Sequence, residues 1–235
     1  MVSIMPSATS LAVVVPTLNA AATLGGTLES LTAAAPGDGP ARLVVADGGS
    51  ADGTTDIARS AGAHVVASPR GRGAQLAAGA AAVREDWILF LHADTRLESG
   101  WRAAVGTFIA DPDNRRRAGH FRLRFDSPHP SARRIERLAS WRARRLGLPY
   151  GDQGLLVARA FYEHLGGYRP LPLMEDVDLV TRIGRRRLRE LSAEAVTSAA
   201  RYERDGWWVR PARNLACLSL YAAGVPPHLI QRLYG

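Results

Sequence analysis

Short apolar runs that alternate with helix-like segments are the feature that most constrains how this chain folds. Four runs rich in Val, Leu and Ile follow one another: Leu11–Val15, Arg42–Ala46, His64–Ala67 and Trp87–Leu91. Between them lie three segments with helical character: Thr23–Ala35, Asp52–Ala61 and Ala74–Val83. Strands that alternate with helices are typical of a parallel sheet joined by right-handed crossovers. The sequence therefore predicts an α/β fold whose sheet is mostly parallel and flanked by helices.

The remainder of the chain is less regular but continues to alternate. The pattern predicts two strands at Gly119–Phe125 and Gly154–Ala158, and helices at Ser131–Leu146, Asp176–Ile183 and Trp207–Ala223, with a short final segment from Pro226. Neither an internal repeat nor a low-complexity linker interrupts the sequence. We therefore expect residues 1–235 to form one domain, which is within the usual size range.

Composition narrows the class of protein. The chain is 46% hydrophobic and 22% charged, as expected of a globular protein with a real core. All 30 basic residues are arginine, and 22 acidic residues leave a net charge of +8. This charge favours anionic partners such as nucleotides, phospholipid headgroups or nucleic acid. The arginine runs Arg115–Arg117 and Arg185–Arg187 come without aromatic interleaving or a nucleic-acid-binding motif, so we expect solvated faces there and no nucleic-acid partner.

The cysteine content and the hydropathy of the chain indicate its cellular compartment. The single Cys217 excludes an intramolecular disulfide and a cysteine-based zinc site, and it agrees with a reducing, cytoplasmic environment. Met1–Ser10 lacks the pattern of a signal peptide, and no apolar window is long enough to cross a bilayer. The Trp207–Ala223 helix leaves two interpretations open: it packs on the domain, or it lies at the inner face of a membrane as a peripheral contact.

Each of the four early strands ends in a polar cluster. The clusters are Pro16-Thr-Leu-Asn19, Asp47-Gly-Gly-Ser50, Ser68-Pro-Arg-Gly-Arg-Gly-Ala-Gln75 and His92-Ala-Asp-Thr95. Because the carboxyl ends of parallel strands meet at one edge of a sheet, we expect these clusters to converge on a ligand site there.

The second and third clusters suit a nucleotide. The Asp47 carboxylate can accept hydrogen bonds from a base or ribose, and Gly48 lets the backbone approach a ligand; a plain Asp-Gly turn is the alternative. Arg70 and Arg72 precede a helix start, where guanidinium groups and free N–H groups suit a phosphate. The segment is neither a P-loop nor a dinucleotide-binding fingerprint.

Two acidic positions suit catalysis. Asp94 directly follows an apolar strand, where a carboxylate can hold a divalent cation that bridges a diphosphate; a turn or helix cap is the alternative. Glu175 and Asp176 open a helix, where acids also serve as caps. A carboxylate in that position can act as the general base that takes the proton of an acceptor hydroxyl.

Five motifs in a fixed order resemble those of one family. They are Pro16-Thr-Leu-Asn19, Asp47-Gly-Gly-Ser-Ala-Asp-Gly-Thr54, Leu91-His-Ala-Asp-Thr95, Tyr150-Gly-Asp-Gln-Gly154 and Met174-Glu-Asp-Val-Asp178. Together they are similar to the family 2 inverting glycosyltransferases of GT-A fold, and within these to the small bacterial branch labelled arsenosugar-biosynthesis-type glycosyltransferases. The resemblance covers nearly the whole chain. It implies a hexosyltransferase-type enzyme, a nucleoside diphosphate sugar as donor, and Mg²⁺ or Mn²⁺ as cofactor.

The resemblance also implies residue roles. Four residues should line the base and ribose pocket: Pro16, Thr17, Asn19 and Asp47. Asp94 matches the last Asp of the family's D-x-D and so the metal ligand, and Asp176, beside Glu175, matches the catalytic base. Three residues fall on the acceptor side: Gly151, Asp152 and Gln153. One departure is His92, which stands where the family has the first Asp; it either contacts the ribose or is structural.

Expected function and organisation follow from these assignments. Residues 1–110 should form the nucleotide-sugar-binding half, 111–200 the acceptor and catalytic half, and 201–235 a C-terminal helical segment. The expected reaction is transfer of a sugar to an unidentified glycan, small-molecule or lipid-linked acceptor by a metal-assisted inverting displacement. Two alternatives stay open: a nucleotidyltransferase of the same architecture, and a non-catalytic module that binds nucleotides or anions.

Overall fold

The computed structural model of this chain describes residues 10–32 and 41–234. Almost all of the Met1–Ser10 segment lies outside this part, as does the expected end of the first helix at Ala35. Within it, an eight-stranded sheet has the order β3-β2-β1-β4-β7-β6-β8-β5. The strand bounds are β1 (Leu11–Thr17), β2 (Arg42–Asp47), β3 (His64–Ala67), β4 (Trp87–Phe90), β5 (Thr95–Leu97), β6 (Ala118–Phe125), β7 (Leu155–Ala158) and β8 (Leu188–Thr197).

The four strands predicted in the first part of the chain form one parallel block. β1 pairs in parallel with β2 and with β4, and β2 pairs in parallel with β3. The residues of β1 from Ala12 to Val15 and those of β4 are almost fully buried. Their Val, Leu, Ile and Phe side chains pack on both faces of the sheet, which explains why these runs are apolar throughout instead of alternating.

The other half of the sheet is mixed. β7 runs antiparallel between β4 and β6, β6 pairs in parallel with β8, and β5 is antiparallel to β8. β5 and β8 are not predicted from the sequence. β5 has three residues, and β8 alternates buried apolar side chains such as Leu191 and Ala195 with charged ones. Strands from both halves of the chain therefore share one sheet.

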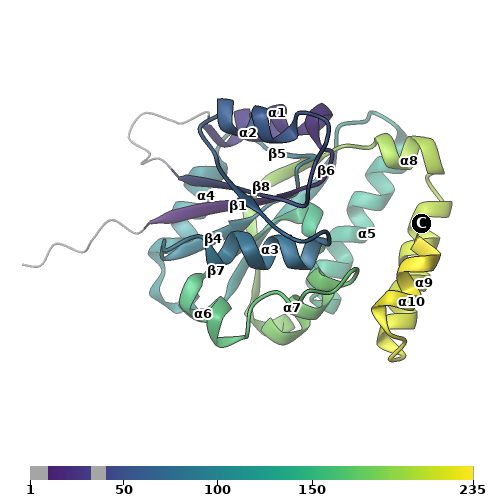
Figure 1. Cartoon of the computed structure of the whole chain (residues 1–235). Helices are drawn as coiled ribbons and strands as arrows, with labels where there is room; N and C mark the ends of the chain where they lie inside the picture. Colours follow the sequence, from purple (N-terminus) through teal and green to yellow (C-terminus); the bar gives the residue numbers. More distant parts are fainter. Residues whose placement is uncertain (1–9, 33–40, 235) are drawn as a thin grey trace, which may run out of the picture.

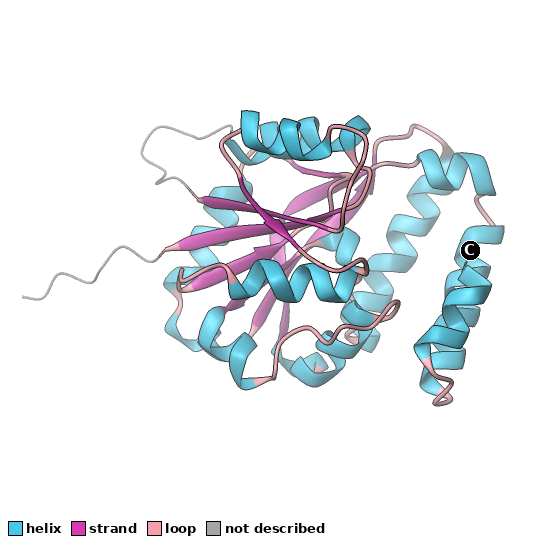
Figure 2. Cartoon of the chain, viewed as in Figure 1, coloured by secondary structure: helices cyan, strands magenta, loops and turns pink. Residues whose placement is uncertain are grey.

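Helices cover both faces of this sheet (Figures 1 and 2). Their bounds are α1 (Ala21–Thr32), α2 (Thr54–Ser60), α3 (Arg72–Ala81), α4 (Trp101–Ala110), α5 (Pro130–Leu146), α6 (Arg159–His164), α7 (Glu175–Ile183), α8 (Ala200–Asp205), α9 (Val209–Ala222) and α10 (Pro227–Tyr234). All helices predicted from the sequence are present, with bounds shifted by a few residues, and α4, α6 and α8 are additional. No helix of the described residues combines the length and apolar character that crossing a bilayer requires.

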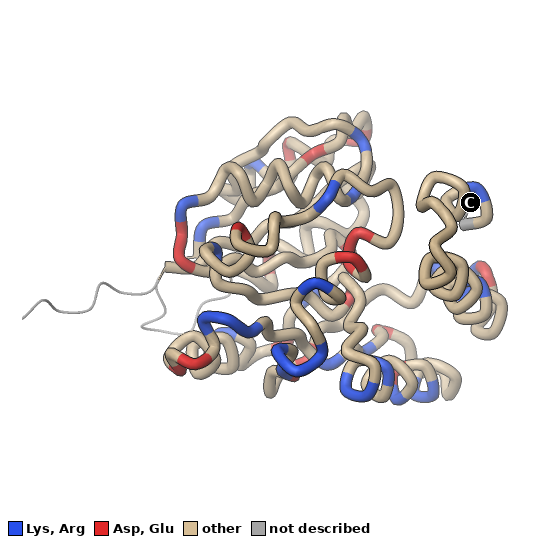
Figure 3. Tube along the Cα trace, turned by 90° about the horizontal axis from the view of Figure 1, so that it is seen from below, with Lys and Arg blue, Asp and Glu red and all other residues tan. Residues whose placement is uncertain are grey.

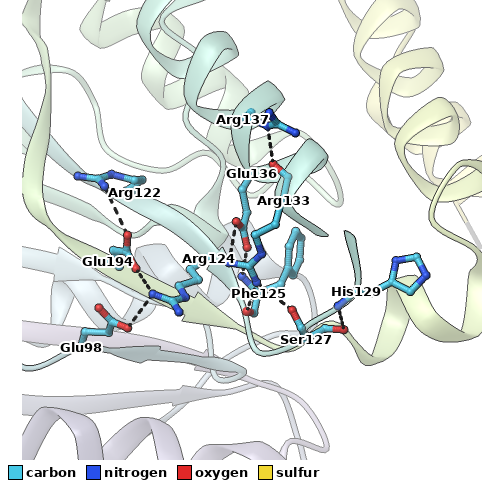
Figure 4. A network of polar contacts seen from close by, with 10 residues as sticks. All are labelled: Glu98, Arg122, Arg124, Phe125, Ser127, His129, Arg133, Glu136, Arg137 and Glu194. Atoms are coloured by element: carbon cyan, nitrogen blue, oxygen red, sulfur yellow. Dashed lines mark hydrogen bonds and ion pairs between the residues drawn. The ribbon is translucent and has the colours of Figure 1, made fainter. Parts of the chain in front are cut away.

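Helix α5 is attached to the end of β6 by a polar network (Figure 4). The Arg133 guanidinium donates to the carbonyl oxygens of Phe125 (3.2 Å) and Ser127 (2.8 Å). The Glu136 carboxylate accepts a hydrogen bond from the Phe125 N–H at 2.7 Å. These side chains satisfy backbone groups at the end of a strand, where the sheet no longer supplies partners.

A second part of the same network lies across β6 and β8. Glu194 of β8 accepts from Arg122 (3.4 Å) and Arg124 (2.9 Å), and Arg124 also faces Glu98 at 3.6 Å (Figure 4). Side chains of opposite charge on neighbouring strands stabilise the pairing of those strands modestly. They explain why a strand rich in Arg and Glu forms part of the sheet.

The C-terminal helices pack on the domain through α8 and the start of α9. The Trp207 ring stacks on His129 at 4.9 Å, and Asp205 pairs with Arg210 (2.8 Å) and Arg213 (3.1 Å). Cys217 is buried on the inner side of α9. The start of the predicted C-terminal helix is therefore attached to the rest of the protein through Trp207 and α8.

Candidate active site

Two adjoining cavities lie at the carboxyl ends of the parallel strands. The larger has a volume of about 770 Å³ and the smaller about 130 Å³. Six residues belong to the walls of both: Arg72, His92, Asp94, Leu173, Ser198 and Arg201. The predicted clusters after β1, β3 and β4 all contribute to the larger cavity through Pro16, Thr17, Asn19, Arg70, Arg72, Gln75, His92 and Asp94.

The cluster after β2 lies behind this wall. The Asp47 carboxylate accepts hydrogen bonds from the Thr17 hydroxyl (2.9 Å), from the Gly49 N–H (2.9 Å) and from the Ser50 N–H (2.8 Å). Burial opposes ionisation, but these hydrogen bonds outweigh it and lower the pKa of Asp47. Gly48 packs beside Gln75, whose amide donates to the Thr17 carbonyl. In this structure Asp47 and Gly48 shape the loop that carries the cavity wall.

Asp94 lies on the wall that the two cavities share. Its carbonyl oxygen accepts a hydrogen bond from the Ser198 N–H at 3.1 Å, and its carboxylate faces Arg201 at 3.8 Å. Asp152 lies on the smaller cavity, where its Oδ1 is buried without a hydrogen-bond partner among the described residues. Burial raises the pKa of Asp152; Arg142 opposes this rise, and the charge of Asp94 adds to it.

The Asp94 and Asp152 carboxylates suit a divalent cation whose remaining ligands come from a bound substrate and water. In the described part of the chain no cluster of three or more His, Cys, Asp or Glu side chains forms a cage for a metal. Mg²⁺ and Mn²⁺ prefer oxygen donors, and Mg²⁺ commonly uses one or two carboxylates together with substrate phosphates and water. Asp94, with the unpartnered Asp152 oxygen on the neighbouring cavity, provides such a donor set.

Asp176 is the second residue of α7 and lines the smaller cavity. The Tyr168 hydroxyl donates to its Oδ1 at 3.1 Å, and the Gly151 N–H donates to its Oδ2 at 3.0 Å. Burial, followed by the charge of Glu175, raises the pKa of Asp176 to about 7, while Arg72 and Tyr168 oppose the rise. A carboxyl group that titrates near neutrality is well matched to general-base catalysis.

Glu175 lies beside Asp176 but has a different environment. Its side chain is 2% exposed and pairs with Arg72 at 3.2 Å, at the start of α3. The ion pair joins the first turns of α3 and α7 and holds Arg72 on the wall shared by the cavities. Glu175 and Asp176 both line the smaller cavity, and Glu175 in addition holds the Arg72 guanidinium.

His92 lies next to Asp176, with its Nε2 3.8 Å from Oδ2. Burial, reinforced by Arg72 and Arg201, lowers the pKa of His92 well below its usual value and so favours the neutral imidazole. Gly151 fits between the two residues, because an added Cβ would overlap both His92 Nε2 and Asp176 Oδ2. In this structure His92 faces the candidate base.

Gln153 supports the loop behind Gly151. It is fully buried, its amide donates to the Phe121 carbonyl at 3.1 Å, and its oxygen accepts from the Tyr150 N–H at 3.4 Å. Of the three predicted acceptor-side residues, Gly151 and Asp152 line the smaller cavity and Gln153 holds their loop.

Several residues at the site are not among those predicted, among them Gln75, Tyr168 and Arg201. Gln75 ends the third polar cluster, so its position was a usable signal. Tyr168 and Arg201 reach the site only through tertiary packing. Tyr168 contacts the Phe90 ring edge to face at 4.9 Å, and Arg201 comes from α8.

Comparison with known proteins identifies the family. The model of glycosyl transferase family 2 matches residues 12–165. The chain belongs to this family. No curated protein sequence matches it significantly.

Solved structures of similar fold agree with this assignment. Glucosyl-3-phosphoglycerate synthase from Mycobacterium tuberculosis, in complex with Mn²⁺, UDP and glucosyl-3-phosphoglycerate, is 21% identical with a TM-score of 0.56, over 81% of this chain and 70% of that one. Mannosyl-3-phosphoglycerate synthase from Rubrobacter xylanophilus is 17% identical with a TM-score of 0.58, over 92% and 75%. A mycobacterial protein is 22% identical with a TM-score of 0.59, over 93% and 76%. The predicted α/β fold of GT-A type is confirmed.

Proposed function

We propose that this protein transfers a sugar from a nucleoside diphosphate sugar to an acceptor hydroxyl with inversion at the anomeric carbon. The larger cavity holds the donor and the smaller one the acceptor. The observation that carries this proposal is the position of Asp176, which lines the smaller cavity, next to a wall that Arg72, His92 and Asp94 share with the larger one. Such a wall is where the two substrates must meet.

The chemistry is a single displacement. Asp176 takes the proton of the acceptor hydroxyl as its oxygen bonds to the anomeric carbon, and the bond from that carbon to the diphosphate breaks with its electron pair on the diphosphate. Tyr168 and Gly151 fix the orientation of the carboxylate through their hydrogen bonds. Arg72, held by Glu175, and Arg70 place positive charge where the leaving diphosphate becomes more negative.

A divalent cation belongs to the proposal. Asp94 would hold it, with Asp152 as the second carboxylate. A bound Mg²⁺ or Mn²⁺ supplies electrostatic stabilisation of the departing diphosphate. The fit of these carboxylates supports the proposal, as does the Mn²⁺ bound with UDP in the similar fold of glucosyl-3-phosphoglycerate synthase.

The remaining proposed contacts bind the donor in the larger cavity and the acceptor in the smaller one. Pro16, Thr17 and Asn19 are the proposed base and ribose contacts, with Asp47 ordering their surroundings. The acceptor is a small molecule, a glycan or a lipid-linked hydroxyl compound, and phosphoglyceric acid, bound by glucosyl-3-phosphoglycerate synthase, is a sensible first candidate. Family membership favours a sugar transferase over the nucleotidyltransferase and the non-catalytic module. A cytoplasmic location stays a prediction.

Calorimetric titration with UDP and GDP, with and without Mn²⁺, tests the donor site. We expect micromolar binding of one nucleotide that depends on Mn²⁺ and weakens at least about tenfold in Asp94→Ala, since one ligand of the cation is lost. Asp56→Ala is the matched control, because Asp56 is an exposed residue of α2 that pairs only with Arg59 among the described contacts. Absence of binding by either nucleotide under all conditions would refute the donor site.

A further inference from the structure

The outer side of α9 is unusual because it carries no charge. Its exposed residues are Val209, Ala212, Leu215, Ala216, Ser219 and Ala222. Successive positions are three residues apart, except for the adjacent Leu215 and Ala216, which places them on one side of the helix. A surface helix ordinarily presents charged and polar side chains to solvent. Trp208, directly before α9, is 70% exposed, and Leu215 is 64% exposed.

The outer side of α5 combines large apolar side chains with arginine. Leu138 and Trp141 are 60% and 54% exposed. Four exposed arginines lie three or four residues from one of this pair: Arg134, Arg137, Arg144 and Arg145. Residues at this spacing are neighbours on a helix surface, so positive charge lies beside the two apolar side chains; of these arginines, Arg144 also faces Glu190 at 4.0 Å.

Exposed apolar side chains are concentrated in these two regions and on α10. Of the nine large apolar side chains that the described residues expose, all but Leu18 lie on α5, on α10 or between Trp208 and Leu215. The regions adjoin, because His129 before α5 stacks on Trp207 before α9, and Ile135 of α5 packs in the same small core as Trp207. Figure 1 shows α5, α9 and α10 at the same end of the molecule.

We propose that this end of the molecule docks on the surface of an anionic lipid bilayer. The docking face consists of Leu138, Trp141, Trp208, Val209 and Leu215 with the four exposed arginines of α5. Tryptophan and leucine side chains insert at the boundary of headgroups and acyl chains, and basic residues add attraction to anionic lipids. Each arginine near such a surface adds to this attraction.

Charge favours a bilayer over a second copy of this chain. A two-fold interface brings the same patch of both copies together. Such an interface would gather the exposed α5 arginines of both copies, and like charges brought close together are destabilising. An anionic bilayer pairs with the same arginines favourably.

The docking face lies beside the smaller cavity. Arg210 and Asn214, from the inner side of α9, line that cavity. Docking would therefore bring the proposed acceptor site to the bilayer surface, where a lipid-borne hydroxyl is available. This consequence rests on the proposed function, whereas the docking itself does not.

Co-sedimentation with vesicles tests the docking. We expect the protein to sediment with phosphatidylcholine vesicles that contain about one third phosphatidylglycerol and to stay in solution with phosphatidylcholine alone. The double variants Trp208→Glu with Leu215→Glu, and Arg134→Glu with Arg145→Glu, should each lower the bound fraction at least about tenfold. Arg59→Glu with Arg84→Glu is the matched control for net charge, because both residues are exposed on other helices or loops.

Two outcomes would overturn the docking. One is a wild-type protein that stays in solution with the anionic vesicles. The other is a dimer in analytical ultracentrifugation that Leu215→Glu dissociates, which would make the face an interface between copies. UDP titration of each variant shows independently whether the donor site is intact, so failure of the proposed function and failure of the docking are distinguishable.

Discussion

At the scale of single residues, Asp176 shows how its surroundings raise the pKa of a carboxyl group toward neutral pH, as the proposed role of base requires. Burial and the neighbouring Glu175 disfavour its charge, and the Tyr168 hydroxyl partly compensates by donating to the charged form. Tyr168 is itself fixed from two sides: its N–H donates to the Tyr162 hydroxyl at 2.9 Å, and its ring packs on Phe90. Tyr168 is therefore expected to position and tune the base without touching the substrate.

Tyr168→Phe should raise the pKa of Asp176 above its value of about 7, because the hydrogen bond that favours the carboxylate is lost. The measurement is a titration of the Asp176 carboxyl carbon by ¹³C NMR, with Asp176→Asn to assign the signal. Once a transferred sugar can be measured, the acid limb of the pH–rate profile should move upward in the same way.

Tyr162→Phe is the control for this prediction. It removes a neighbouring buried hydroxyl that accepts from the Tyr168 N–H, and it leaves the contact to Asp176 in place. Equal pKa values of Asp176 in the wild type and in Tyr168→Phe would show that Tyr168 has only a packing role.

At the scale of elements, α5 and β6 illustrate how a helix is held against the end of a strand. The helix is predicted at Ser131–Leu146 and observed at Pro130–Leu146, since an arginine-rich amphipathic segment after a proline specifies its own bounds. Its docking depends on Glu136 and Arg133, which bond to backbone groups of the β6 end. These contacts place α5, and with it the arginines of the docking face.

Glu136→Ala should lower the free energy of unfolding by about 1–3 kcal/mol, because it leaves the partly buried Phe125 N–H without its partner. Urea denaturation measures this change. Glu163→Ala is the comparison, since it removes a mostly exposed pair with Arg159 and should cost less than about 0.5 kcal/mol. Equal losses in the two variants would contradict the anchoring role.

At the scale of the whole molecule, one sheet joins the two halves and carries the site at a single edge. Basic positions are spread over several separate helices and loops and do not form one stripe (Figure 3). This agrees with the expectation that the charge of +8 does not serve a nucleic acid. At the site, the raised pKa of Asp176 makes the free energy of unfolding depend on pH.

Asp176→Asn should stabilise the protein more at pH 8 than at pH 5. The pKa of Asp176 is near 3.8 when unfolded and about 7 when folded, so its contribution to stability is fully present below pH 3.8 and is lost as pH rises through 7. The asparagine side chain is neutral at every pH, so the variant does not lose stability in this way as pH rises. Urea denaturation at both values of pH should therefore show a widening difference, whereas Asp56→Asn on the exposed α2 should show a constant one.

The sequence by itself determined the parallel block, most of the helices around it, the family and most of the residues that converge at the edge of the sheet. It could do so because runs buried on both faces are apolar throughout, and because the ends of parallel strands meet. Only the tertiary structure decided that β5 and β8 complete the sheet, that Asp47 lies behind the wall, and that Tyr168 and His92 face Asp176. These features depend on contacts between residues far apart in the chain, and no local pattern encodes such contacts.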